Sequence, residues 1–333
     1  MDTEELQQKI FAEIKRKIGE NTSAADEIAK LLEISSDSAY RRIRGEKTIS
    51  LDELYKLCTH YKISLDQMME IQTGSFLFQG QLLDSKTYRY DEYLMTTLHW
   101  LAYFNSFKEK EYYYLCKDMP IFHHFYFREL ASFKYYFWLK TVFHFPDFDK
   151  RKFKVDDYPE EYFELGRKIA TTYNQIPCVE IWNLESINTM IRQMEYCRDN
   201  QIFESDREAL KVYEAVEKYF DYLQKQAELG YKYEITDPEK KPLGHLKMYF
   251  NEWILLDNSM MAALDNTRLS VIPHTAINYM LCRDMIFTEK HYQYIQNLMQ
   301  RSTQISEVSE KERSRFFRIL RERIEKRKES LKV

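Results

Sequence analysis

The sequence predicts a mainly α protein, with a small helical module at its N-terminus and a large helical C-terminal part. Two observations favour this class. First, only 7 of the 333 residues are glycine and 7 are proline, about 2 % each, where folded proteins usually contain roughly 7 % and 5 %. Second, helix-start signals recur at short intervals in the first seventy residues. With so few turn-forming residues, an all-β or α/β fold is not expected.

One stretch departs from the helical pattern. Between residues 252 and 273, short apolar runs are separated by Asp257-Asn258-Ser259 and by Asp265-Asn266-Thr267. Turns rich in Asp and Asn between such runs are typical of a β-meander, although runs of this length also fit helices. The sequence therefore allows one small β-meander near 252–273, and we expect helices to resume near Thr275.

The length of the chain favours two domains, and we place them at 1–72 and 73–333. Apolar residues at helical spacing predict a first helix from Thr3 to Ile18, which Gly19 ends. The boundary is set at Thr73-Gly74-Ser75, because the patterns that follow it are those of longer helices.

The N-terminal module is defined by its helix starts. A hydroxyl that accepts an N–H of the first turn, with an acidic or amide side chain three residues later, is the capping box. Sequences that fit or approximate it are Ser23 to Asp26, Ser50 to Glu53 and Ser64 to Gln67, and Ser35 supplies a further hydroxyl start. Four starts within fifty residues predict a compact group of short helices.

The order of these features resembles the helix-turn-helix of phage-repressor-like (Xre/Cro-type) DNA-binding regulators, over residues 23–69, about a fifth of the chain. The residues that carry the resemblance are Ile28, Ala29 and Leu32 for the buried face of the second helix, Ile34 to Ser38 for the turn and the start of the recognition helix, Tyr40 to Lys47 for its end and the glycine turn, Ile49 to Leu54 for the opening of the fourth helix, and Tyr61 to Asp66 for the approach to the fifth. Two positions depart from the family: Glu33 stands where its turn has glycine, and Arg44 where many members carry another polar residue.

The resemblance implies a five-helix domain whose recognition helix enters the major groove of double-stranded DNA. It places Ser36, Asp37, Tyr40 and Arg41 at the base edges, with Arg41 suited to O6 and N7 of guanine. Phosphate contacts are expected from Arg44 and Lys47 past the helix, and from open N–H groups at the second helix start near Ser23. Arg42 is expected to point away from DNA.

Charge does not by itself indicate a nucleic-acid binder. The chain has a formal net charge of −4, and its first seventy residues contain 11 basic and 14 acidic residues. Non-specific binding to DNA depends on many phosphate contacts by Lys and Arg. Any binding to DNA should therefore rest on a few residues, with Arg41, Arg44 and Lys47 first among them.

Motifs of catalytic and metal sites are missing from the sequence. Its five cysteines are scattered without a CxxC pair, its histidines lack ligand spacing, and no P-loop, GxGxxG or GxSxG occurs. We therefore expect no metal, no cofactor and no enzymatic activity. The scattered cysteines and the absence of an N-terminal signal region favour the cytoplasm. The most apolar run, 121–145, contains charged residues, so no membrane contact is expected.

These observations predict a sequence-specific transcription regulator. The C-terminal part would mediate dimerisation, the sensing of a small-molecule or peptide effector, or both, and the protein would act as a homodimer. The alternative is a protein-interaction module, toxin-neutralising or scaffold-like, that uses the helix-turn-helix for protein contacts.

Two features of the C-terminal part remain open. The aromatic residues between 88 and 145 fit either a ligand pocket or a plain core. The last helix, from Lys311 to Lys332, has 10 basic and 4 acidic residues. It fits either an anion-binding surface or a helix docked by Phe316, Phe317 and Leu320.

Overall fold

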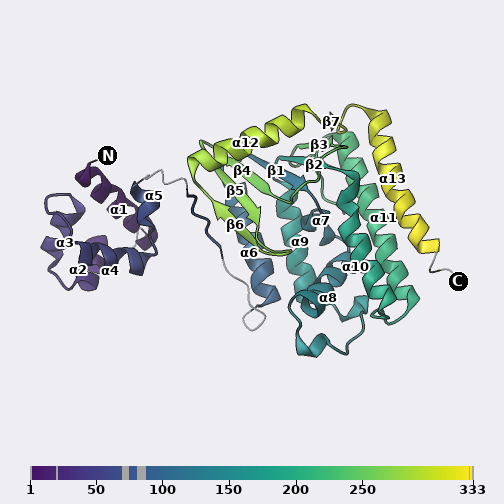
Figure 1. Cartoon of the computed structure of the whole chain (residues 1–333), viewed down its shortest axis with the longest axis horizontal. Helices are drawn as coiled ribbons and strands as arrows, with labels where there is room; N and C mark the ends of the chain where they lie inside the picture. Colours follow the sequence, from purple (N-terminus) through teal and green to yellow (C-terminus); the bar gives the residue numbers. More distant parts are fainter. Residues whose placement is uncertain (1, 20–21, 70–74, 81–87, 330, 332–333) are drawn as a thin grey trace. The chain divides into compact units, whose positions relative to one another are not determined.

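The computed structural model describes the chain except for residues 1, 20–21, 70–74, 81–87, 330 and 332–333 (Figure 1). The chain forms two compact units, Met1–Leu77 (unit 1) and Phe78–Val333 (unit 2). Of the expected boundary at Thr73-Gly74-Ser75, the first two residues lie outside the described part. The two units are treated separately below.

The described part of unit 1 consists of short helices. They are α1 (Thr3–Ile18), α2 (Ala24–Leu32), α3 (Ser36–Ile43), α4 (Leu51–Tyr61) and α5 (Leu65–Met69). Local capping explains most of their starts, because Ser23, Ser35 and Ser50 each accept a backbone N–H of the helix that follows. Residues from four of these helices form one core, with Ile10, Ile14, Ile28, Leu32, Ala39 and Leu57 buried in it.

Unit 2 is built on a mixed sheet, not on helices alone. Its described strands are β1 (Lys110–Cys116), β2 (Cys178–Trp182), β3 (Leu246–Phe250), β4 (Met260–Leu264), β5 (Thr267–Pro273), β6 (Tyr279–Cys282) and β7 (Thr303–Gln304). They form a seven-stranded sheet in the order β6-β5-β4-β1-β2-β3-β7. The strands β1, β2 and β3 run in parallel, and the remaining pairs are antiparallel.

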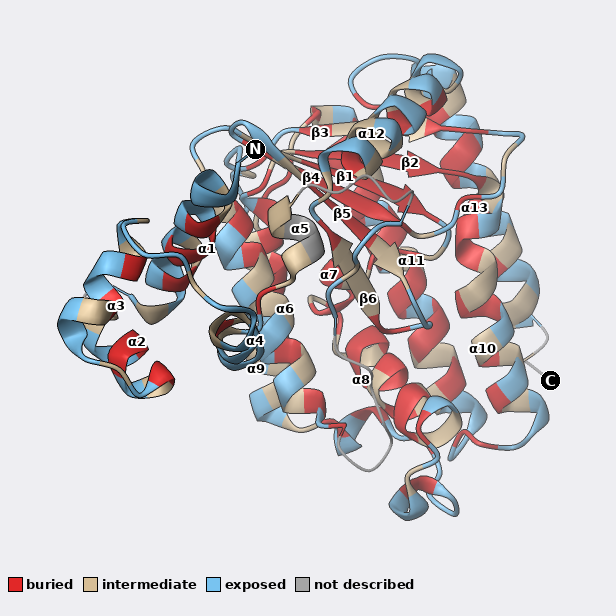
Figure 2. Cartoon of the chain, turned by 60° about the vertical axis from the view of Figure 1, so that its left-hand side comes forward, coloured by how far each residue is buried: buried red, intermediate tan, exposed pale blue. Residues whose placement is uncertain are grey.

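Helices cover both faces of this sheet. They are α6 (Tyr90–Asn105), α7 (Ile121–His124), α8 (Arg128–Phe137), α9 (Glu160–Asn174), α10 (Asn188–Asp199), α11 (Asp206–Leu229), α12 (Met285–Gln300) and α13 (Glu310–Glu329). Tyr112 and Tyr114 of β1 belong to the larger core, which includes residues of α6 to α11 and α13. Tyr113 and Leu115 belong to a smaller core with residues of α12, and Figure 2 shows α12 over the buried strands.

The prediction of a mainly α, all-helical C-terminal domain is wrong, because the sheet is a substantial part of unit 2. The strands β1 and β2 are buried on both faces over most of their length, so Lys110–Cys116 and Cys178–Trp182 lack the alternation that marks a half-exposed strand. A short apolar run of this kind cannot be told from a buried turn of helix by periodicity. The scarcity of glycine and proline is explained by helical crossovers, which connect β1 to β2 and β2 to β3.

The region expected to form a small meander belongs to this same sheet. The strands β4 and β5 lie within 252–273 and pair in antiparallel, while 252–257 forms no strand. Helix does not resume near Thr275, because β6 follows first and α12 begins at Met285.

The basic last helix is docked on unit 2. The side chains of Phe316, Phe317, Leu320 and Ile324 are buried in the larger core. Several of its basic residues pair with acidic residues of other helices, as in Arg321–Asp221 at 2.7 Å, Arg327–Glu195 at 3.1 Å and Lys328–Glu217 at 2.7 Å. This pairing neutralises much of the charge that the sequence suggested for an anion-binding surface.

In the described part of the chain, every helix is too short or too polar to cross a bilayer.

Candidate nucleic-acid interface

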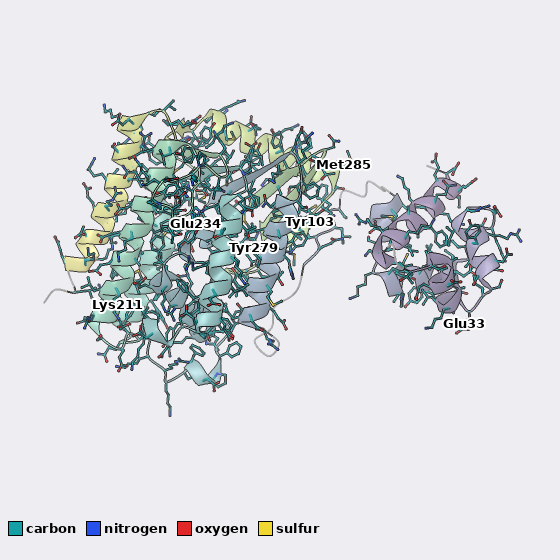
Figure 3. All side chains as sticks on the ribbon, turned by 180° about the vertical axis from the view of Figure 1, so that it is seen from behind. Glu33, Tyr103, Lys211, Glu234, Tyr279 and Met285 are labelled. Carbon is teal, nitrogen blue, oxygen red and sulfur yellow. The ribbon has the colours of Figure 1, made fainter. Side chains whose placement is uncertain are left out.

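The turn between α2 and α3 is built without glycine. Glu33 ends α2 with φ 57° and ψ 44°, in the left-handed region, and its side chain lies on the surface of unit 1 (Figure 3). The next amide, that of Ile34, donates to the carbonyl of Ala29 over 3.0 Å. For a residue with a Cβ atom this conformation costs about 1–2 kcal/mol, so the turn between α2 and α3 carries some backbone strain.

One face of α3 is anchored by a buried arginine. The guanidinium of Arg42 donates to both carboxylate oxygens of Glu53 on α4, over 3.1 and 2.7 Å, and to the carbonyl of Ser38 over 3.1 Å. These charge-assisted bonds hold the pKa of Glu53 below its usual value, chiefly through Arg42. The guanidinium therefore fixes α3 against α4 and is not available for an outside ligand.

A second anchor comes from α1. The amide nitrogen of buried Gln7 donates to the carbonyls of Arg42 and Lys47, over 2.7 and 2.9 Å. Its amide oxygen accepts the N–H of Ile49 over 3.1 Å. One side chain thus fixes both ends of the loop that follows α3. Sequence reasoning missed this residue, and the signal was a glutamine at a position that shares the apolar spacing of Ile10 and Ile14.

The side chains predicted to reach base edges are all exposed. Ser36, Asp37, Tyr40 and Arg41 occupy positions i, i+1, i+4 and i+5 of α3, and buried Ala39 and Arg42 lie on the other side. Ser36 has a partner inside unit 1, because its hydroxyl donates to Asp26 on α2 over 2.8 Å. This bond and one from Ser23 lower the pKa of Asp26.

The basic residues at the end of α3 share one acidic partner. Glu46 lies 3.9 Å from Arg41 and 3.5 Å from Arg44, and all three side chains are about half exposed. Arg44 also stacks on the ring of Tyr40 at 4.4 Å and donates to its hydroxyl over 3.0 Å, which raises the pKa of Arg44. Exposed pairs of this kind are weak, so a phosphate could replace Glu46 at little cost.

The remaining predicted residues are also on the surface. Lys47 is exposed, and its backbone N–H donates to the carbonyl of Arg41 over 3.3 Å. Ser23 caps α2 by accepting the N–H of Asp26 over 3.4 Å. The first turn of α2 already contains Asp26 and Glu27, whose charges oppose a phosphate at this helix start.

A few titratable groups of unit 2 are enclosed. Glu180 on β2 is fully buried and accepts bonds from Tyr173 over 2.6 Å and Trp182 over 2.8 Å. Lys232 is also fully buried and donates to the carbonyl of Tyr173 over 2.7 Å. Across the described residues, His, Cys, Asp and Glu side chains do not gather in threes suitable for a metal ion, and the five cysteines are free thiols.

No protein-family model, curated protein or solved structure matches the chain.

Proposed function

We propose that the protein is a sequence-specific transcription regulator that binds double-stranded DNA through α3. The observation that supports this proposal best is the mounting of α3. Its inner side is fixed by Arg42 to α4 and by Gln7 to α1, while Asp37, Tyr40 and Arg41 are exposed. A rigid helix with an exposed polar face suits direct readout, because the backbone that carries those side chains does not have to be ordered on binding.

In this mechanism α3 enters the major groove and Arg41 leaves Glu46 to pair with a guanine. Asp37 accepts from a cytosine amine, and Arg44 and Lys47 contact phosphates. Few basic groups take part, so a single copy of unit 1, the DNA-binding headpiece, binds DNA weakly. A homodimer in the cytoplasm would place two headpieces one helical turn of DNA apart, about 34 Å.

Unit 2 would then supply the dimer contact, the response to an effector, or both. An effector changes DNA binding only to the extent that it binds one arrangement of the headpieces more tightly than another.

The test is selection of binding sites from random duplex DNA with the full chain. A two-fold symmetric motif is expected, and Arg41→Ala should then weaken binding to it by about 1–3 kcal/mol. The matched control is Arg16→Ala, an exposed arginine on α1, which should leave the affinity unchanged. If the protein is folded and the selection enriches no motif, the proposal is refuted.

A second candidate function is a protein-interaction module, and one observation favours it. Leu51 and Tyr55 lie four residues apart on one side of α4 and are 83 % and 71 % exposed. Exposed apolar side chains beside an acidic helical unit suit a protein partner better than DNA. Under this alternative, selection yields no motif although unit 1 is folded, as circular dichroism would show.

A further inference from the structure

Unit 2 contains a small cavity of about 40 Å³ that no step of the proposed DNA binding uses. It lies beyond the carboxyl end of β1, where Tyr114 and Asp118 line it together with Lys134 and Trp138. Ile277, from the connection between β5 and β6, and Tyr279, the first residue of β6, line it as well. Figure 3 labels Tyr279, which lies within unit 2. Open α/β sheets commonly bind ligands at the carboxyl ends of their parallel strands.

Two backbone irregularities border the cavity. At Trp138 the helix α8 passes into a π-helical turn, Trp138–Val142. Asn258, another lining residue, has φ 71°. Single turns of π-helix are frequent at functional sites, and strained backbone conformations cluster there too.

The cavity wall contains a partly buried ion pair. Lys134 is 3 % exposed and its ammonium lies 3.2 Å from Asp118, whose side chain is 23 % exposed. The ammonium also donates to Gln193 over 2.9 Å. An ammonium has three N–H donors, and among the described residues only these two side chains accept from it. One donor of Lys134 is therefore left for a ligand.

Aromatic rings form much of the remaining wall. Tyr93, Tyr114, Trp138 and Tyr279 all line the cavity, and the hydroxyl of Tyr279 accepts from Asn258 over 2.9 Å. Aromatic faces attract ammonium groups. The ammonium of Lys134 can therefore bind the carboxylate of a ligand. The carboxylate of Asp118, together with the aromatic faces, can bind the ammonium of a ligand.

We propose that this cavity binds a small zwitterion of the α-amino acid class, of the size of glycine or alanine. A ligand with one charge would bring an uncompensated charge against an ion pair that is already neutral and partly buried. A zwitterion adds no net charge, because its carboxylate pairs with Lys134 and its ammonium with Asp118 and the rings. The volume, room for roughly three water-sized groups, restricts the ligand to the smallest members of the class.

The same wall residues lead to the segment that follows unit 1. Tyr279 begins β6, and Leu281 of β6 exchanges two backbone bonds of 2.8 Å with Gln79. Gly80 lies so close to β6 that an added Cβ atom would come within 3.2 Å of the carbonyl of Tyr279. A ligand held against Tyr279 therefore contacts the strand that holds Gln79. An effect on DNA affinity rests on the proposed function, whereas binding of the ligand does not.

The experiment is calorimetric titration of the full chain, without DNA, with glycine, alanine, acetate and methylammonium. Saturable binding of glycine or alanine is expected with a Kd below about 10 mM, which is within the range that so small a ligand can reach. Acetate and methylammonium should each bind at least about tenfold more weakly. No binding of either amino acid, or equal binding of acetate, overturns the proposal.

Variants extend this test. Asp118→Asn should weaken glycine binding at least about tenfold, and Asp147→Asn, an exposed carboxylate outside the cavity, should not. Unchanged glycine binding by Asp118→Asn would overturn the assignment of the site to this cavity. If that variant misfolds, the comparison of the four ligands on the wild-type chain still tests the proposal. Hydrogen exchange at Gln79 and Leu281 should slow with glycine. If no DNA motif is enriched but the chain binds glycine, the proposed role in transcription is refuted and the proposed amino-acid site still stands.

Discussion

Acidification from pH 7.5 to pH 5 should destabilise unit 2 through two adjacent histidines of α7. His123 and His124 are 1 % and 0 % exposed. Asn174 lies 2.9 Å from Nε2 of His123, while Nδ1 of His123 and both ring nitrogens of His124 have no hydrogen-bond partner among the described residues. Burial lowers the pKa of His123 to about 3. Burial, with the neighbouring charge of Lys134, also lowers that of His124 well below its usual value.

The sign of the effect follows from these directions. In the unfolded chain both imidazoles titrate near pH 6.5, so the unfolded state binds protons that the folded state cannot. The stability is fully present above about pH 6.5 and is lost as the pH falls toward the folded pKa values. At pH 5, His123 alone accounts for a loss of about 2 kcal/mol, and the two histidines together for up to about 4 kcal/mol. Domains are stable by only about 5–15 kcal/mol.

Urea unfolding at several pH values measures this loss. All four tryptophans, Trp100, Trp138, Trp182 and Trp253, lie in unit 2, so tryptophan fluorescence follows that unit alone. His124→Met, of similar volume and without a titrating group, should reduce the pH dependence by about half. His99→Gln, an exposed histidine on α6, is the control. A loss of less than about 1 kcal/mol in the wild type between pH 7.5 and pH 5 would refute the reasoning.

Three further predictions concern unit 1. Arg42→Ala should destabilise it by about 3 kcal/mol, because the carboxylate of Glu53 loses its buried partner; thermal melting followed by far-UV circular dichroism measures this. Glu33→Gly should stabilise it by roughly 0.5–1 kcal/mol, because the left-handed turn then carries no Cβ strain, and the same melts report the gain. Glu46→Gln should tighten binding to a selected DNA site at low salt, measured by fluorescence anisotropy, because it frees Arg41 and removes a charge that repels phosphate.

Each has an internal check. Arg42→Ala should leave the tryptophan transition of unit 2 unchanged, and an equal loss in both units would contradict a local role. Lys62→Gly is a second left-handed position, with φ 50° at the end of α4, and should match the gain of Glu33→Gly. Weaker DNA binding by Glu46→Gln would mean that Glu46 itself contributes to the complex.

The headpiece was predictable because its signals are local. Ser50 and Glu53 are three residues apart and form the capping box that the sequence indicated, and α1 has the predicted bounds, Thr3–Ile18. The sheet of unit 2 was not predictable in this way. Tyr112 pairs with Cys178 on one side and with Ala262 on the other, and no short window of sequence contains these partners.

The site shows the same division. The resemblance placed Tyr40 and Arg41 on the outer side of the recognition helix, and both are exposed on α3. The interactions of Gln7 join residues that are 35 to 42 positions apart. The basic residues of the last helix suggested an anion-binding surface for the same reason. The partners of Arg321 and Lys328 lie about a hundred positions earlier in the chain and could not be recognised from the sequence.

The pairing of β1 with late strands has a consequence for the order in which the chain folds. Unit 1 closes its core within its first 63 residues and can fold soon after it leaves the ribosome, since domains generally fold as units from the N-terminus. The central strand β1 must wait for β4, and the larger core is complete only after Phe316 and Phe317 of α13 have been synthesised. Contacts between residues so far apart in the chain slow folding. We therefore expect a finished headpiece to precede a slowly assembling unit 2 during synthesis.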